Sequence, residues 1–170
     1  MKLFGLTLIC TLAGALLFAQ EGFKIGINGE VPVGDNQDVV SLGIGADVGY
    51  MWALGEVVDV GAMAGFINGF PEKYHQEVGS PDLPNVQFLP LAASVRIWPS
   101  NSFSFGGQIG TAIGINEGND GGFYYKPTIG YLMGAVTEIN LSYTGIAVDN
   151  AQWATVNLGI LYTFPSKRFY

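Results

Sequence analysis

The sequence predicts an all-β fold, an eight-stranded antiparallel up-and-down transmembrane β-barrel. Three observations support this prediction: long segments in which apolar and polar residues alternate, a high hydrophobic content, and an abundance of glycine. The 170 residues include 49% hydrophobic and only 12% charged residues, whereas a soluble domain has roughly 25% charged residues. The length corresponds to one domain, and the composition favours a membrane protein.

The clearest alternating segment covers residues 40–52, with the sequence VSLGIGADVGYMW. Every second residue from Val40 to Trp52 is apolar, and the residues between them are mostly small or polar and include the carboxylate of Asp47. Strict alternation is the period of a β-strand, and this segment is longer than the usual soluble strand of about 5–6 residues. One apolar face and one small, polar face indicate a strand between lipid and a narrow packed interior.

The hydrophobicity is not arranged for membrane helices, because no run of about 18 apolar residues follows the N-terminus. The 25 glycines show no collagen period, and each would destabilise a helix interior by about 1 kcal/mol. A formal net charge of −7 argues against a nucleic-acid partner, since surfaces that bind nucleic acids are basic.

Residues 1–19 are expected to form a secretory signal peptide, which leaves residues 20–170 as the barrel domain. Lys2 precedes a continuous apolar stretch, and Ala19 is expected to be the last residue removed. The alternative is a single N-terminal membrane anchor, which the short apolar run and the lack of a basic flank disfavour. Cys10 is the only cysteine, so no disulfide or thiol chemistry is expected in the mature chain.

Seven further segments alternate in the same way, which gives eight expected strands. They are residues 23–33, 58–66, 89–98, 103–115, 123–133, 139–144 and 153–164. Pro90 and Pro127 each remove a ladder hydrogen bond, so a bulge or a strand end is expected near each of them. In the seventh segment the alternation is lost after Thr144. An even number of strands joined in order closes an up-and-down barrel.

The connections between the strands predict the orientation of the barrel. Those after the second, fourth and sixth strands are tight, whereas the other four are polar and generally longer. In membrane barrels of this type the short connections and both termini are periplasmic, and the long connections are extracellular. The longest irregular segment, residues 68–85, is the only expected surface feature long enough to hold a partner.

Aromatic residues on the apolar faces are expected to form two rings, one at each membrane interface. The periplasmic ring comprises Phe23, Tyr50, Trp52, Phe103, Phe105, Tyr131, Tyr162 and Phe164, and the outer ring comprises Phe66, Phe123, Tyr125 and Trp153. The core of a soluble protein would scatter its aromatic residues, so this clustering is a second indication of a membrane wall.

The signal peptide, the alternating strands, the two aromatic rings and a last strand ending in Leu161-Tyr162-Thr163-Phe164 resemble the small eight-stranded outer membrane β-barrel proteins of Gram-negative bacteria. The resemblance covers essentially the whole mature chain. It implies a monomer in the bacterial outer membrane, in contact with outer membrane lipids and lipopolysaccharide. It also implies the barrel insertion machinery as a partner. Members of this family often end at the aromatic residue of the last strand, which the insertion machinery recognises. In this chain residues 165–170 follow the last strand. We expect Phe164, rather than the terminal Phe169-Tyr170, to be the recognised residue, because its parity fits that of the strand.

Seven charged residues are expected to point into the barrel: Lys24, Glu30, Asp47, Asp59, Arg96, Lys126 and Glu138. An eight-stranded barrel is only wide enough to be filled by side chains, and an isolated buried charge costs several kcal/mol. The expected arrangement is a salt-bridged plug. In it, Arg96 and Lys24 neutralise Asp47, Asp59 and Glu138, while Lys126 pairs with Glu30. This structural role predicts a barrel without an open channel.

Two classes of function remain open. The favoured one is a non-enzymatic barrel that contributes to envelope integrity or to surface contact through its extracellular loops. The second is a lipid-modifying enzyme at the outer rim, or a barrel that passes small hydrophobic molecules. The only histidine, His75, has Glu72, Glu77, Ser80 and Asp82 nearby in one loop. A catalytic site is recognised by geometry rather than by sequence proximity, so no catalytic residue is predicted.

A soluble lipocalin-like carrier is a less favoured alternative. The apolar strand faces would then point inward, and the surface would carry glycine, serine, threonine and asparagine with few charges. Soluble surfaces are normally far more charged. No metal and no cofactor are expected, since the mature chain has one histidine and no cysteine, and the acidic loop residues are not spaced as a calcium loop.

Overall fold

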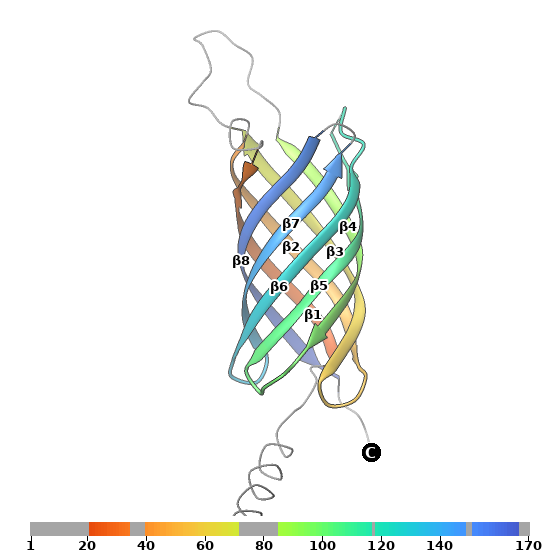
Figure 1. Ribbon diagram of the computed structural model, residues 1–170, viewed down its shortest axis with the longest axis vertical. Coiled ribbons are helices and arrows are strands. Elements are labelled where there is room, and N and C mark those ends of the chain that lie inside the picture. The colour runs from red at the N-terminus through yellow and green to blue at the C-terminus, as the bar shows by residue number, and fades with distance from the viewer. Residues whose placement is uncertain (1–20, 35–39, 72–84, 117, 149–150, 167–170) are drawn as a thin grey trace, which may run out of the picture.

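The computed structural model describes residues 21–34, 40–71, 85–116, 118–148 and 151–166. They form eight strands: β1 (Gly22–Pro32), β2 (Val40–Ala53), β3 (Val58–Pro71), β4 (Val86–Ile97), β5 (Phe103–Gly114), β6 (Gly122–Met133), β7 (Thr137–Val148) and β8 (Ala151–Pro165). Each strand pairs antiparallel with the next, and β8 pairs with β1, which closes the barrel (Figure 1). The predicted all-β, eight-stranded antiparallel barrel is confirmed. No helix among the described residues is long and apolar enough to cross a membrane.

The two ends of the barrel differ in their connections. At one end, which we call the turn end, residues 54–57, 98–102 and 134–136 join the strands. Gly55 (φ 91°) and Gly134 (φ 78°) adopt left-handed conformations in two of these turns, which glycine does without steric cost. The opposite end is the loop end. The connection between β7 and β8 there has only residues 149 and 150, so the expectation of a longer loop at this position was wrong.

The outward face of the wall is apolar along the middle of the barrel. Large side chains such as Ile27, Leu141 and Leu158 are 67%, 53% and 64% exposed. Soluble proteins rarely expose contiguous apolar patches larger than a few hundred Å², whereas an outward apolar band flanked by aromatic residues is the surface of a transmembrane barrel. The outward face therefore corresponds to the lipid face that the alternation predicts.

The eight aromatic residues expected in the periplasmic ring all lie outward on the wall near the turn end. They are Phe23, Tyr50, Trp52, Phe103, Phe105, Tyr131, Tyr162 and Phe164. The rings contact one another within and between strands, with centroids 4.8 Å apart for Tyr162 and Phe164 and 6.2 Å apart for Phe103 and Tyr131. Phe23, at the start of β1, contacts Phe164 at 6.1 Å. Trp153, which was expected in the outer ring, does not point outward.

The two strand prolines do not shift the register. β3 and β4 pair as Ala64↔Leu91 on one side of Pro90 and as Ile67↔Phe88 on the other, with the same offset. The β6–β7 ladder likewise keeps its offset across Pro127. The expectation of a bulge or a strand end near each proline was therefore wrong: each ladder is interrupted locally and resumes in register.

Three strands extend further toward the loop end than the alternation predicts. β3 continues to Pro71, β4 begins at Val86, and β7 continues to Val148. Strand parity is kept in β7, because this strand holds one register with β8 from Thr137 to Val148. The alternation stops in the sequence only because the inward positions become apolar in this segment, so the expected loss of parity after Thr144 was wrong.

Candidate functional site in the barrel lumen

All seven charged residues expected inside the barrel belong to inward-facing positions of the strands. Six of them are buried, with Lys24, Glu30, Asp59 and Glu138 at most 2% exposed. The seventh, Asp47, is slightly more open, with a side-chain exposure of 15%. Since water is largely excluded from these side chains, their partners decide how the lumen is stabilised.

The charged residues closest to the turn end include an ion pair between Arg96 on β4 and Glu138 on β7. Arg96 Nη2 lies 3.1 Å from Glu138 Oε1, and Ser104 Oγ donates a hydrogen bond of 3.2 Å to the other carboxylate oxygen. Gly130 lies beneath the Glu138 carboxyl group, and a Cβ at this position would collide with it. The glycine on β6 thus lets Glu138 cross the lumen toward β4 and β5.

Two more charged groups at this end bind neutral partners. The indole Nε1 of Trp98 donates a hydrogen bond of 2.8 Å to Asp59 Oδ2, and Lys24 Nζ donates one of 2.8 Å to Thr163 Oγ1. Trp98 follows the last residue of β4 and is only 2% exposed. Together with Arg96 and Glu138, these residues form what we call the turn-end cluster.

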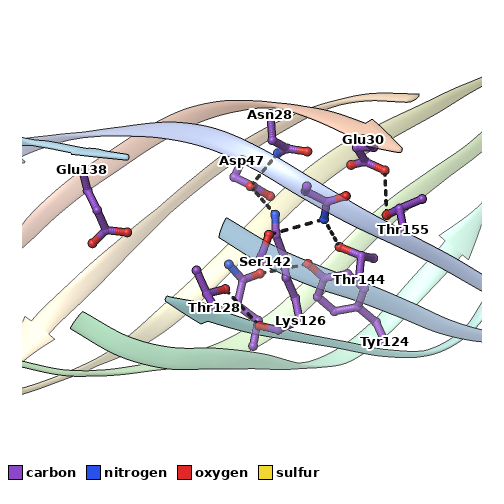
Figure 2. A network of polar contacts seen from close by, with 12 residues as sticks. Asn28, Glu30, Asp47, Tyr124, Lys126, Thr128, Glu138, Ser142, Thr144 and Thr155 are labelled. Atoms are coloured by element: carbon purple, nitrogen blue, oxygen red, sulfur yellow. Dashed lines mark hydrogen bonds and ion pairs between the residues drawn. The ribbon is translucent and has the colours of Figure 1, made fainter. Parts of the chain in front are cut away.

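The second ion pair lies in the middle of the lumen and joins β2 to β6 (Figure 2). Lys126 Nζ lies 2.7 Å from Asp47 Oδ2, and Asn28 Nδ2 donates a hydrogen bond of 3.1 Å to the same oxygen. These three residues from β1, β2 and β6 form the waist cluster. Charge-assisted hydrogen bonds of this length are among the stronger polar contacts in proteins.

The expected charge pairs are partly wrong. Lys126 pairs with Asp47, not with Glu30, and Asp47 is bound from β6 and β1 rather than by Arg96 or Lys24. The Glu30 carboxylate instead accepts a hydrogen bond of 3.3 Å from Thr155 Oγ1 on the neighbouring β8 (Figure 2). Residue type and parity cannot predict these pairs, because the height of each side chain in the lumen depends on the stagger of the strands.

The loop end of the lumen is apolar, which the sequence did not lead us to expect. Seven buried residues pack together there: Val40, Ile67, Phe88, Ala112, Tyr124, Ile146 and Trp153. We call this group the apolar cap. Tyr124 and Ile146 are fully buried, and the Phe88 and Trp153 rings meet edge to face with centroids 5.3 Å apart. The cap is the larger of two hydrophobic core clusters among the described residues; the smaller one comprises Met51, Met63 and Leu161.

The placement of Trp153 in the outer aromatic ring was wrong. It points inward and is 5% exposed, and its ring lies against Gly69 so closely that a Cβ there would collide with it. Its inward parity matches that of Thr155 and Asn157, both fully buried on the same strand. Parity counted back from Asn157 would have placed Trp153 correctly from the sequence.

Val40 was also expected on the lipid face, but it is buried in the apolar cap at 2% exposure. The register between β2 and β3 shifts between Val40 and Leu42. Such an irregularity inserts one residue and reverses the direction of the side chains beyond it. Alternation that continues through a bulge gives no signal in the sequence, so this error could not have been avoided.

A small cavity of about 20 Å³ lies in the lumen between the turn-end cluster and the waist cluster. Its lining includes Lys24, Asp47, Arg96 and Lys126, and also Met51 and Met63. No group of three or more His, Cys, Asp or Glu side chains that could hold a metal ion occurs among the residues that the structure describes. His75, Glu72, Glu77, Ser80 and Asp82, considered for catalysis at the rim, lie outside the described residues, as do residues 1–19 of the expected signal peptide.

Solved structures with the same fold include the Yersinia pestis outer membrane protein Ail. Its structure in a phospholipid bilayer nanodisc is 16% identical, with a TM-score of 0.58 over 85% of this chain and 100% of that chain. Its crystal structure is also 16% identical, with a TM-score of 0.57 over 86% of this chain and 99% of the other. A de novo designed transmembrane β-barrel is 13% identical, with a TM-score of 0.53 over 86% and 98%.

No protein-family model matches this chain, and no curated protein sequence does. The structural likeness therefore rests on the fold itself, eight antiparallel strands closed into a barrel. The chain has the eight-stranded transmembrane β-barrel fold of small bacterial outer membrane proteins.

Proposed function

We propose that this protein is a non-enzymatic outer membrane barrel, closed to ions, that serves envelope integrity or surface contact through its extracellular loops. The observation that carries the proposal is the filling of the lumen at three successive levels, by the turn-end cluster, the waist cluster and the apolar cap. An eight-stranded barrel leaves room for side chains rather than for an aqueous pore.

The apolar cap is the part of the lumen that best supports closure. Its seven members come from seven strands, β2 to β8, and Tyr124, Ile146 and Ala112 are at most 1% exposed. An ion that crossed this level would lose its hydration without gaining a charged partner, which costs far more than thermal energy. Rearrangement of the ion pairs in the turn-end and waist clusters would leave this barrier in place.

Conductance in planar lipid bilayers tests the proposal. The purified, refolded full-length chain should give no discrete conductance steps, and steps of appreciable size would overturn the closed barrel. Heat-modifiable migration on a gel confirms that the inserted protein is folded.

Variants of the apolar cap and of the waist cluster make the conductance test more specific. Phe88→Ala with Trp153→Ala weakens the cap, and Lys126→Met with Asp47→Leu removes the waist pair. Since the levels lie in series along the lumen, each double variant alone should stay closed. Any leak of ions should be largest when all four changes are combined, which leaves only the turn-end cluster in the lumen. Conductance of the waist variant alone would show that the cap is not a barrier.

Catalysis at the outer rim is tested separately with lipid A as the substrate. We expect its acylation, followed by mass spectrometry, to stay unchanged by the protein. A change that His75→Ala abolishes would replace the non-enzymatic proposal with a rim enzyme.

A further inference from the structure

The charges of the lumen do not balance. Three of its seven charged side chains are cations and four are carboxylates, so they carry one excess negative charge. The turn-end cluster has two cations and two carboxylates, and in the waist cluster Lys126 pairs with Asp47. The carboxylate left over is that of Glu30, which is 1% exposed and forms no ion pair among the residues that the structure describes. Since an uncompensated buried charge is strongly destabilising, a counterion is expected at Glu30.

Two oxygen atoms without a hydrogen-bond donor face each other beside this carboxylate. Thr155 donates to Glu30 Oε2, but Glu30 Oε1 is buried and accepts no hydrogen bond from a described residue. Asn28, two residues earlier on the same face of β1, directs its Nδ2 at Asp47, and its buried Oδ1 likewise lacks a donor (Figure 2). A Cβ on Gly45 would lie 2.5 Å from Asn28 Oδ1 and 2.7 Å from Glu30 Oε1. The two oxygens are therefore close enough to bind one small ion.

A third oxygen of this kind belongs to Asn157 on β8. Asn157 is fully buried and lies directly opposite Glu30 in the β1–β8 ladder. Its Nδ2 donates hydrogen bonds to Ser142 Oγ and Thr144 Oγ1, whereas its Oδ1 has no donor among the described residues. Opposite residues of antiparallel strands have Cβ atoms about 4.5–5.5 Å apart, so Asn157 can reach the same ion as Glu30.

We propose that Glu30, Asn28 and Asn157 bind one alkali-metal cation, sodium or potassium, inside the barrel. Carboxylate and carbonyl oxygens are the ligands of hard cations, and carbonyl oxygens can replace the hydration shell of an alkali ion. One positive charge balances the excess negative charge of the lumen. Calcium takes about six to eight oxygen ligands, commonly several carboxylates, whereas this site has a single carboxylate.

The two simpler occupants fit less well. A water molecule can donate to two of the three oxygens, but it leaves the charge of Glu30 uncompensated. A proton on Glu30 removes the charge and can be donated to Asn28 Oδ1, but it leaves Asn157 Oδ1 without a partner. The site lies between the waist cluster and the apolar cap, and a cation held there is a structural ion that needs no open channel. The proposal therefore does not depend on whether the barrel conducts.

Unfolding in salts of different cations tests the site. The full-length chain is refolded in lipid vesicles at constant ionic strength, while sodium or potassium chloride replaces the chloride of N-methyl-D-glucamine, a cation too large for the site. An ion that binds only the folded barrel should raise the folded-to-unfolded ratio about tenfold for each tenfold rise in its concentration above the dissociation constant. Urea titration measures this ratio. A ratio that does not depend on the cation, or that depends on pH alone, would overturn the proposal.

Glu30→Gln keeps the shape of the side chain and removes its charge, so it should abolish the cation dependence. Glu138→Gln is the matched control, because it neutralises another buried carboxylate of the lumen, which has Arg96 as its partner at 3.1 Å. The control should lose stability and keep the cation dependence. Loss of the dependence in both variants, or in neither, would contradict the site.

Rubidium, which replaces potassium and scatters X-rays anomalously, locates the ion directly. Crystals of the native chain grown in rubidium chloride should show one anomalous peak beside Glu30 Oε1. A lumen without such a peak, or a peak that persists in Glu30→Gln, would overturn the assignment.

Discussion

The middle of the barrel and its loop end have interiors of opposite polarity. In the middle, charged and polar side chains such as Asp47 and Lys126 point inward, and apolar ones such as Leu158 point outward. At the loop end, Ile146 and Trp153 point inward, while the outward positions include Gln87 and Gln152. The inward face of one continuous sheet thus changes from polar to apolar, whereas the outward face at the loop end mixes polar residues with exposed apolar ones such as Phe70 and Phe123.

The difference shows where the hydrocarbon ends. An apolar outward face is stable only against lipid, and an apolar inward face is stable wherever side chains can pack. On β4 and β8 the outward residues nearest the loop end include Gln87 and Gln152, so we expect these strand ends to project beyond the hydrocarbon. There, Asn68 Oδ1 accepts hydrogen bonds from Gln87 Nε2 and Asn85 Nδ2, at 2.9 and 3.3 Å. The middle is held by ion pairs and the projecting end by a hydrophobic core.

The largest expected effect comes from breaking an ion pair of the turn-end cluster. Arg96→Ala leaves the Glu138 carboxylate buried at 2% exposure without its cation, and the loss of one partner of a buried pair costs about 3–5 kcal/mol. The free energy of unfolding, measured by urea titration in lipid vesicles, should fall by this amount, whereas insertion should be unaffected. Unchanged stability would show that the pair of Arg96 and Glu138 does not stabilise the lumen.

The double variant Arg96→Ala with Glu138→Ala provides the control for this prediction. It removes both charges, so most of the loss should be recovered, because the single variant is destabilised chiefly by an unpaired buried carboxylate. If the double variant is as unstable as the single one, the destabilisation reflects lost packing of the arginine stem rather than charge.

The apolar cap should respond to the loss of volume instead. Ile146 is fully buried, and Ile→Ala in a packed core costs about 2–5 kcal/mol. Leu158→Ala is the matched control, since this side chain is 64% exposed on the wall and lipid can refill the space. Equal losses in the urea titration would contradict the description of the cap as the core of the barrel.

The sequence predicts the middle of the barrel far better than its loop end. Alternation identifies a strand when one face is apolar and the other is not, and this condition holds from Leu42 to Trp52 and over most of β5. It also placed the seven charged residues on the inward side. It could not supply their partners, because the contact of Lys126 with Asp47 joins strands that are not neighbours.

At the loop end the same alternation continues with its polarity exchanged. A pattern that assumes a polar interior therefore ends β3 too early, starts β4 too late and misplaces Trp153. Strand parity carried through the exchange would have found Ile67, Phe88 and Ile146 as core residues. Parity could not have predicted the inward position of Val40, because nothing in the residue types indicates the bulge between Val40 and Leu42.

The position of the hydrocarbon boundary can be measured with a single charge. Leu158 lies in the middle of β8, and Leu158→Arg should cost about 2–4 kcal/mol, the usual penalty for arginine at the bilayer midplane. Gln152→Arg, six residues nearer the loop end, should cost about 0–1 kcal/mol, as at an interface. Similar penalties in vesicle-based unfolding would mean that the outward face does not change from lipid to water between these positions.

The smallest expected effect concerns the outward polar contacts at the loop end. Gln152→Ala removes the hydrogen bond of 2.7 Å to the Tyr125 hydroxyl, and a typical hydrogen bond contributes about 0.5–1.5 kcal/mol. Because Gln152 is exposed and water can replace it at the hydroxyl, the loss should be at the low end of this range. Tyr125→Phe keeps the ring over Gly145 but removes both this bond and the side-chain hydrogen bond with Tyr143, so it should lose at least as much stability in the urea titration. A clearly larger loss for Gln152→Ala would show that this side chain has a further role in holding the projecting end of the barrel.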